Sequence, residues 1–212
     1  MSWARETNLI KRLKHLLRCV IEKALWTVLQ CRLAWAYRLY SIEAVNRALL
    51  RCNSAYVGDI LLRFGANVGP GYDLHSPLLI HNAERDYSNL TIGRRCHLGK
   101  EVFLDLRDTI TIEDEVTISM RAMILTHIDV GHSPLGERDV PTGKSPVVIR
   151  HGAYVGAGAI ILQGVTVGEC AMVGAGAVVT RDIPDYSVAM GVPARVLRPI
   201  RRSAEPVERG RL

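Results

Sequence analysis

Apolar and polar residues follow two different patterns along the chain, and the pattern changes near residue 57. Residues 9–51 contain neither Gly nor Pro, and apolar residues recur there at steps of three and four. That spacing places the apolar side chains on one side of a helix. The sequence therefore predicts an N-terminal helical segment over residues 1–55, made of one or two amphipathic helices with a break near Tyr40 and Ser41.

A period of six replaces the helical period in the rest of the chain. Aliphatic residues recur every six positions from Leu62, with a break at Asp86 and one eight-residue step after Leu104. The last run has no break: Ile149, Val155, Ile161, Val167, Val173 and Val179. A glycine follows the repeated aliphatic residue at six places: Gly69, Gly93, Gly99, Gly156, Gly168 and Gly174.

A six-residue period predicts short strands and not helices. Because six is even, the repeated side chain returns to the same face of an extended chain. One large aliphatic residue, one small residue and a Gly at a turn make one strand and one bend, and three such units close a triangular coil. We therefore expect an all-β parallel solenoid over residues 56–184, with an extruded loop at about 129–147 and a tail over 185–212.

The last coils carry a family resemblance. Residues 149–184 resemble the signature of hexapeptide-repeat acyltransferases, and Gly191-Val192-Pro193-Ala194-Arg195 is similar to the closing motif of that family. The resemblance, which extends over residues 57–198, implies a left-handed β-helix and a homotrimer with active sites between subunits. It also implies acetyl-CoA as co-substrate, no metal, and transfer to a hydroxyl. The chain lacks the long helical domain of serine acetyltransferases and resembles exopolysaccharide and lipopolysaccharide O-acetyltransferases more closely, which implies a carbohydrate acceptor.

The candidate catalytic residue stands where the repeat pauses. Residues 131–146 are polar and rich in turn formers, so we expect them to leave the coil. His127 lies just before this loop, where the related maltose, galactoside and xenobiotic acetyltransferases carry their catalytic His. A neutral imidazole is well suited to remove a hydroxyl proton as the oxygen attacks a thioester. We expect Asp105 and His132 on the acceptor side, and the remaining histidines to be structural or solvated: His15, His75, His81, His97 and His151.

The same resemblance implies a set of residues that bind the coenzyme. The backbone N–H of Ala157 would stabilise the oxyanion, and backbone groups near Ala157 and Ala175 would meet the pantetheine amides. Tyr154 stands where many relatives carry an aromatic residue beside the coenzyme. The phosphates and the adenine ribose would face Thr180, Arg181, Arg195 and Arg198.

Charge separates the N-terminal segment from the rest. Residues 1–51 hold ten Lys and Arg against three Glu, a net charge of +7, whereas the whole chain has +6. The segment is interpreted first as a cap or subunit-packing element, and alternatively as a helix on an anionic membrane, with Trp3, Trp26 and Trp35 beside basic residues. Five scattered Cys without a Cys-x-x-Cys pair and no apolar leader lead us to expect a cytoplasmic protein, with possible peripheral membrane contact and no nucleic-acid partner.

Two other functions remain open at this point. Gamma-class carbonic anhydrases use the same β-helix and bind a metal through three His, two of them five residues apart. His127 and His132 have that spacing, and His81 or His97 of a neighbouring subunit could complete the set. That family has no use for the closing motif at 191–195. The third interpretation is a non-catalytic β-helix that acts as an assembly scaffold.

Overall fold

The computed structural model describes residues 3–138, 140 and 142–201, which excludes the last part of the predicted tail, residues 202–212. The side chains of residues 3–19, 22, 23 and 137 also lie outside the description, including those of Trp3 and His15. The chain forms two compact units, residues 1–48 and 49–212. Each unit is described by itself.

The N-terminal unit is helical. Helix α1 (Trp3–Tyr40) and helix α2 (Ile42–Leu49) are separated at Ser41, whose φ of 60° no helix can continue. The predicted break near Tyr40 and Ser41 is therefore confirmed. Several large apolar side chains of α1 are exposed, namely Val20, Ile21, Leu25, Val28, Trp35 and Leu39. Among the described helices, none combines the length and the apolar character that crossing a membrane requires.

The second unit begins with helical turns before its first strand. The 3-10 helix η1 (Ser54–Tyr56) precedes helix α3 (Val57–Arg63), which buries Val57, Ile60 and Leu61. Leu62, which the six-residue register places inside a coil, is instead 45% exposed. The helical period explains this exposure, because Val57, Ile60 and Leu61 share one face of the helix and Leu62 lies outside that face. The six-residue register therefore begins at Val68 and not at Leu62.

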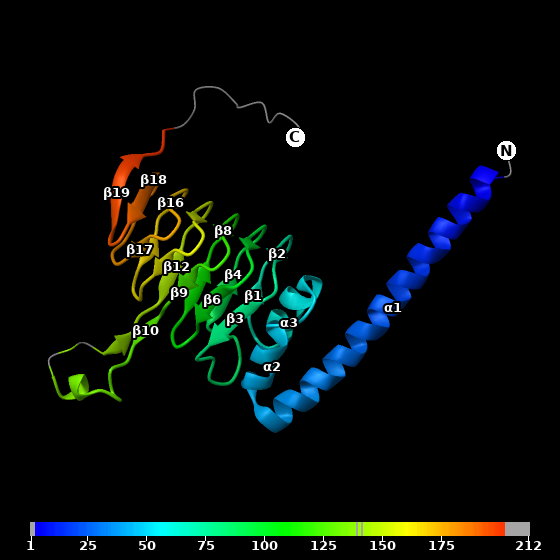
Figure 1. The fold of residues 1–212 in the computed structure, drawn as a ribbon, viewed down its shortest axis with the longest axis horizontal. Helices are drawn as coiled ribbons and strands as arrows, with labels where there is room; N and C mark the ends of the chain where they lie inside the picture. Colours follow the sequence, from blue (N-terminus) through cyan, green and yellow to red (C-terminus); the bar gives the residue numbers. More distant parts are fainter. Residues whose placement is uncertain (1–2, 139, 141, 202–212) are drawn as a thin grey trace. The chain divides into compact units, whose positions relative to one another are not determined.

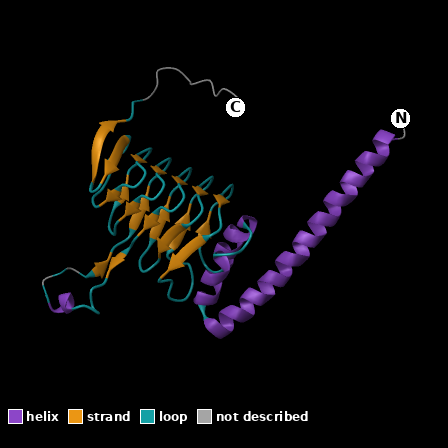
Figure 2. Cartoon of the chain, in the orientation of Figure 1, coloured by secondary structure: helices purple, strands orange, loops and turns teal. Residues whose placement is uncertain are grey.

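The predicted parallel β-solenoid is confirmed, and it consists of five coils with three strands each (Figures 1 and 2). Sheet A contains β1 (Asn67–Val68), β4 (Leu90–Ile92), β7 (Ile110–Ile112), β12 (Val147–Ile149) and β15 (Thr166–Val167). Sheet B contains β2 (Asp73–Leu74), β5 (His97–Leu98), β8 (Thr117–Ile118), β13 (Tyr154–Val155), β16 (Met172–Val173) and β18 (Ser187–Gly191), with β19 (Ala194–Pro199) antiparallel to β18. Sheet C contains β3 (Leu78–His81), β6 (Val102–Asp105), β9 (Met123–Ile124), β14 (Ile160–Ile161) and β17 (Val178–Val179).

The interior of the prism is a stack of identical positions. The repeated aliphatic residues of successive coils pair in register, as Ile112 pairs with Ile149 and Ile149 with Val167, and all three are fully buried. The glycine after the repeated residue permits close approach of the next coil. A Cβ on Gly156 would lie 2.5 Å from the Ala175 nitrogen, and one on Gly93 would lie 2.5 Å from the Asp114 nitrogen. These glycines are therefore required because they have no side chain. Other glycines, such as Gly158 at φ +66°, lie at turns where the backbone is left-handed.

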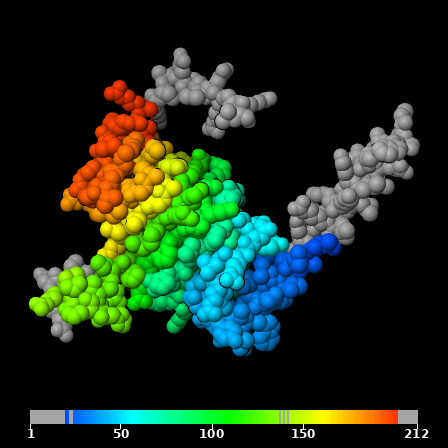
Figure 3. Space-filling view, in the orientation of Figure 1, coloured from blue at the N-terminus to red at the C-terminus, as the bar shows by residue number. Residues whose placement is uncertain are grey.

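Residues beyond the number that a regular coil contains leave the prism at one corner. The chain runs from sheet A to B to C and, in the first three coils, returns to sheet A through residues 82–89, 106–109 and 125–146. Counted between repeated aliphatic residues, these returns take 12, 8 and 25 residues (Ile80 to Ile92, Leu104 to Ile112 and Ile124 to Ile149), against 6 from Ile161 to Val167. The third connection is the predicted extruded loop. It begins and ends in the antiparallel pair β10 (His127–Ile128) and β11 (Gly143–Lys144), contains the 3-10 helix η2 (Pro134–Glu137), and projects from the solenoid surface (Figure 3).

Two leucine substitutions test the register of the solenoid. Leu104→Ala should lower the free energy of unfolding by about 2–5 kcal/mol, because it opens a cavity in a rigid stack. Leu62→Ala should change it by less than about 0.5 kcal/mol, because Leu62 is half exposed on α3. Denaturant unfolding of both variants measures the difference. Equal losses would mean that Leu62 belongs to the core after all.

Candidate active site

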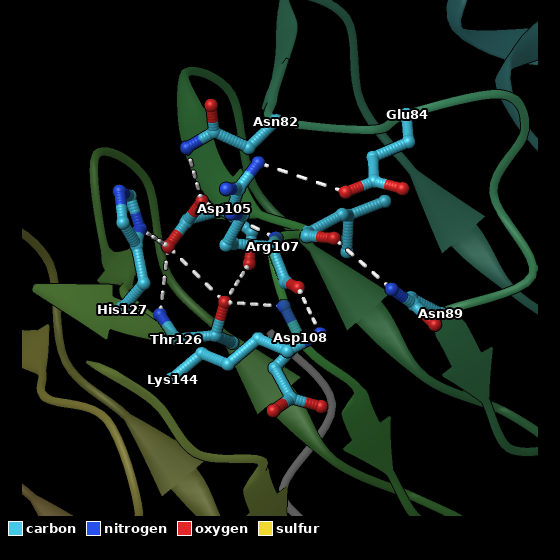
Figure 4. A network of polar contacts seen from close by, with 10 residues as sticks. Asn82, Glu84, Asn89, Asp105, Arg107, Asp108, Thr126, His127 and Lys144 are labelled. Carbon is cyan, nitrogen blue, oxygen red and sulfur yellow. Dashed lines mark hydrogen bonds and ion pairs between the residues drawn. The ribbon is translucent and has the colours of Figure 1, made fainter. Parts of the chain in front are cut away.

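The enlarged corner brings polar residues from three successive coils together (Figure 4). Strand β6 lies between β3 and β9, with His81 opposite Asp105 and Leu104 opposite Ile124. The residues at the ends of these strands and just after them are therefore stacked as well. Asn82 comes from the first coil, Asp105 from the second, and Thr126 and His127 from the third. In-register pairing thus assembles a site from residues more than 40 positions apart in the sequence.

Asp105 lies at the centre of this cluster. Its side chain is 1% exposed, so its charge must be compensated by neighbouring groups. Asn82 Nδ2 donates to Asp105 Oδ1 at 2.8 Å, and the Thr126 N–H donates to Oδ2 at 2.9 Å. His127 Nδ1 lies 2.6 Å from the same Oδ2. Three donors from two neighbouring coils therefore surround one buried carboxylate.

These contacts decide the charge state of Asp105. Burial is the largest single influence on the pKa of Asp105, and burial raises this pKa. The hydrogen bonds from Asn82, His127 and the Thr126 N–H act in the opposite direction and outweigh it, so the pKa of Asp105 lies below its ordinary value. The side chain is therefore an ionised carboxylate at neutral pH.

Thr126 fixes the backbone around the carboxylate. Its hydroxyl donates to the Asp105 carbonyl oxygen at 2.7 Å and accepts from the Asp108 N–H at 3.0 Å. The side chain is fully buried. A buried hydroxyl with both a donor and an acceptor partner holds the second and third coils at a fixed separation. The orientation of His127 is therefore set by buried groups, even though its own side chain is 29% exposed.

The geometry determines which nitrogen of His127 is basic. An ionised carboxylate only accepts hydrogen bonds, so the Nδ1 that faces Asp105 carries the proton. The neutral imidazole then has its lone pair on Nε2. This is the arrangement of a general base whose tautomer is held by a buried carboxylate.

A pocket of about 320 Å³ lies beside His127 at the foot of the extruded loop. Its walls come from the two antiparallel strands of the loop and from the two shorter connections of the same corner. Arg107 lies 3.6 Å from Glu84, and Lys144 donates to the Arg107 carbonyl oxygen at 3.3 Å. The lining residues are Glu84, Arg107, His127, Ile128, Asp129, Thr142, Gly143 and Lys144. Such a wall of hydrogen-bonding groups suits a polar, hydroxyl-bearing molecule.

The two residues expected on the acceptor side, Asp105 and His132, lie in different parts of the structure. Asp105 is buried and contacts His127, so it orients the imidazole and is shielded from the pocket. His132 lies exposed in the extruded loop, outside the residues that line the pocket. Sequence reasoning missed Asn82, Thr126 and Lys144. The lengths of the three C-to-A connections would have indicated them, because residues that leave the prism at one corner must stack there.

The predicted coenzyme residues lie elsewhere on the solenoid. Tyr154 is on the outer face of sheet B, where the Ser119 hydroxyl donates to its hydroxyl oxygen at 2.9 Å. Ala157 and Ala175 are at the corner between sheets B and C, on successive coils joined by the Gly176 N–H and the Ala157 carbonyl oxygen. Four further residues lie exposed after β17 or on β19: Thr180, Arg181, Arg195 and Arg198.

Within one chain, the coenzyme residues and His127 are on different corners. His127 follows sheet C, whereas Ala157 and Ala175 precede it. No hydrogen bond or ion pair between described residues joins the two groups. In the described part of the chain, the group of side chains with metal-ligand spacing is Asp73, His75 and His97, which includes neither His127 nor His132.

Comparison with known proteins finds similarity to bacterial transferases and acetyltransferases. The family model described as "Bacterial transferase hexapeptide (six repeats)" matches residues 146–181. Galactoside O-acetyltransferase of Escherichia coli is 33% identical over 114 residues, which cover 51% of this chain and 56% of that protein. The chain thus spans about half the length of the curated relatives that it matches.

Solved structures share the fold over a longer stretch. A maltose O-acetyltransferase from Clostridium difficile 630 has a TM-score of 0.64 and 27% identity, with 75% of this chain and 84% of that chain covered. A galactoside acetyltransferase in complex with coenzyme A has a TM-score of 0.64 and 25% identity, with 75% and 78% covered. By the repeat, the five-coil solenoid and these matches, the chain is similar in sequence and in fold to hexapeptide-repeat acetyltransferases.

Proposed function

We propose that this protein is an O-acetyltransferase that moves an acetyl group from acetyl-CoA to a hydroxyl of a carbohydrate. The observation that carries the proposal is the orientation of His127 by the buried, ionised Asp105 beside a polar pocket. The relatives named galactoside and maltose O-acetyltransferase, and the neighbour in complex with coenzyme A, support the same chemistry.

The proposed reaction uses His127 as a general base. Acetyl-CoA supplies the acetyl group as a thioester. As the hydroxyl oxygen bonds to the acetyl carbon, Nε2 of His127 takes the hydroxyl proton, and Asp105 stabilises the imidazolium that forms. The carbon–sulfur bond breaks, and the proton passes from His127 to the sulfur. Because Asp105 keeps the proton on Nδ1, His127 offers Nε2 in every cycle without a rearrangement of tautomers.

The polar pocket beside His127 supports a carbohydrate acceptor. Glu84, Asp129 and Thr142 provide oxygen acceptors, and Arg107 and Lys144 provide donors. A sugar presents several hydroxyls, each of which both donates and accepts, so it needs both kinds of group around it. We propose that a precursor of a polysaccharide or lipopolysaccharide occupies this pocket. We also propose that Asp129 or Thr142 contacts this acceptor, in place of the contact that was expected from His132.

The corner between sheets B and C fits the extended arm of the coenzyme. The turns at Ala157-Gly158 and Ala175-Gly176 are stacked, and a Cβ on either glycine would meet no atom within 4 Å. Among the described residues, the N–H groups of Ala157 and Ala175 donate to no protein acceptor, so both are available to amide carbonyls or to an oxyanion. Arg181, Arg195 and Arg198 have no acidic partner in the described part of the chain, which leaves them available for phosphates.

The outer faces of the prism support the proposed homotrimer with shared sites. The outward residues just before the repeated aliphatic residues are mostly Thr in sheet A. In sheet C the residues at this position are all apolar: Leu79, Phe103, Met123, Ile160 and Val178. We infer that the apolar face of sheet C is covered by a second copy of the chain. Its two edges are the corners of His127 and of Ala157, so this contact would bring a catalytic corner of one copy to a coenzyme corner of the next.

Contact of α1 with an anionic membrane stays a prediction, beside its alternative as a packing element. The exposed apolar residues Val28 and Trp35 lie on the same helix as the basic residues Arg32 and Arg38. An interfacial helix combines these two features. A helix that packs on another copy of the chain would also expose them in an isolated subunit.

Replacement of the base tests the mechanism. His127→Ala should lower kcat by about 10²-fold or more, because a positioned base contributes about 10²–10⁴-fold. The pH profile of kcat/KM should lose its ascending limb, since deprotonation of an imidazole no longer limits the rate. His132→Ala is the matched control and should retain most activity. A His127→Ala enzyme with near-normal turnover on its acceptor would exclude this mechanism.

Replacement of the orienting carboxylate tests both rate and stability. Asp105→Asn should lower kcat by roughly 10- to 10³-fold, because the tautomer of His127 is no longer imposed. The depressed pKa of Asp105 stabilises the fold above the ordinary carboxyl pKa, and this contribution is lost as pH falls through the folded-state value. The difference in thermal stability between wild type and Asp105→Asn should therefore shrink between pH 7 and pH 3. The control Asp114→Asn, in an exposed ion pair, should keep its activity; an Asp105→Asn enzyme with unchanged kcat would contradict the orienting role.

A charge on the apolar face tests the assembly. Phe103→Glu should convert the trimer to smaller species in light scattering, because the contact would bury an unpaired carboxylate. Thr111→Glu, on the polar outer face of sheet A in the following coil, should remain trimeric. Loss of activity should accompany loss of the trimer if the sites are shared. A wild-type protein that stays monomeric at micromolar concentration would refute the shared site.

A further inference from the structure

Sheet B carries a second group of chemically active side chains, well separated in the fold from the corner of His127. Asp73 and His97 are direct partners in the register of β2 and β5, and His75 is the next outward position after Asp73. The His75 N–H donates to the Leu98 carbonyl oxygen at 2.9 Å, so its backbone is held by the second coil. All three residues project from the outer face of the first two coils.

The two imidazoles converge on one carboxylate. His75 Nε2 lies 3.2 Å from Asp73 Oδ1, and His97 Nδ1 lies 2.8 Å from Asp73 Oδ2. The imidazole rings meet edge to face with their centroids 5.3 Å apart. One ligand atom from each residue lies within 4.8 Å of the other two. Zinc bonds of about 2.0–2.2 Å at tetrahedral angles separate neighbouring ligand atoms by about 3.3 Å, which is comparable with the 2.8 and 3.2 Å between the imidazole nitrogens and the two Asp73 oxygens.

We propose that Asp73, His75 and His97 form a zinc-binding site that joins the first two coils of the solenoid. Two neutral imidazoles and one carboxylate are a ligand set that Zn²⁺ accepts, with one position left for water or a fourth donor. The cations nearby in sequence do not compete for Asp73, because Arg94 is paired with Asp114 and Arg95 with Glu115. The backbones of all three ligands are fixed by strand pairing, so binding requires only rotation of side chains.

The position of the site suggests what the metal does. The C-terminal coils continue into the β18–β19 hairpin, which pairs with β16 and extends sheet B. Strand β2 forms the opposite edge of the same sheet. An edge strand of two residues has few hydrogen bonds of its own and opens readily. A metal bound to Asp73 and His75 on one coil and to His97 on the next would hold this edge closed.

Zinc binding by the full-length protein tests the proposal. After treatment with a chelator, titration calorimetry should give one zinc ion per chain at this site, and zinc should raise the melting temperature. His75→Ala and His97→Ala should each weaken binding by at least about 10-fold and remove the rise in melting temperature. His151→Ala, a histidine outside the cluster, should bind zinc as the wild type does. Without zinc, all three variants should melt close to the wild type, because these side chains are partly exposed.

A second probe separates this site from other histidines. Cobalt(II) should give visible absorption bands in the wild type and in His127→Ala, and these bands should be lost in His97→Ala. Zinc binding that persists in both His75→Ala and His97→Ala would overturn the proposal. So would loss of binding in His127→Ala alone, which would assign the metal to the active site, or the absence of any binding at micromolar zinc. In that last case the cluster is a carboxylate hydrogen-bonded to two imidazoles.

Discussion

Hydrogen bonding of each strand to the strand one coil away is the constraint on which this structure depends. Parallel pairing in register fixes each coil directly above the previous one, so every side chain has a fixed neighbour in the next coil. Identical aliphatic residues then fill the interior, and glycines such as Gly156 allow the backbones to approach. Extra residues can be accommodated only where the chain turns between sheets. The position of the candidate active site follows from which turn receives these extra residues.

The number of residues between paired positions of successive coils shows where the extra residues lie. Val68 pairs with Ile92, 24 residues later, and Ile92 pairs with Ile112, 20 residues later. Ile112 pairs with Ile149, 37 residues later, and only the next coil, from Ile149 to Val167, has the minimal 18. All the surplus leaves between sheets C and A. Polar residues at or just after the ends of three successive strands of sheet C are therefore stacked into one site, with Asp105 between Asn82 and Thr126.

The energetic cost of the site lies in the buried charge of Asp105. Removal of a carboxylate from water is expensive, and three directed donors from neighbouring coils offset that cost. Each donor is positioned by strand pairing, so the charge in turn favours the register that brings Asn82 and Thr126 together. The same contacts that stabilise the stack also hold His127 with Nδ1 toward Asp105. Stability and the chemistry of the site are thus not separable at this corner.

The sequence alone predicts the repeat, the helix break at Ser41, the extruded loop and the position of His127. These features depend on local spacing and on turn residues, which a single chain displays directly. The start of the solenoid was predicted too early, because Leu62 fits a six-residue period by chance while its helix places it outward. The role of Asp105 and the contribution of Asn82 depend on which residues are stacked across coils of unequal length. Asp86 and the eight-residue step after Leu104 read as defects of the repeat, although they are the insertions that build the site.

The distribution of groups over the prism also supports the proposal that a complete site needs two copies of the chain. Sheet C separates the corner that carries His127 from the corner that carries Ala157 and Ala175, and its outer face is apolar between them. A contact that pairs one edge of this face with the opposite edge of another copy is heterologous, so it is satisfied when a rotation closes a ring. Each contact then buries apolar side chains and completes one site at the same time. Burial of Phe103 and its neighbours would supply the association energy, while the catalytic groups at the edges remain accessible to both substrates.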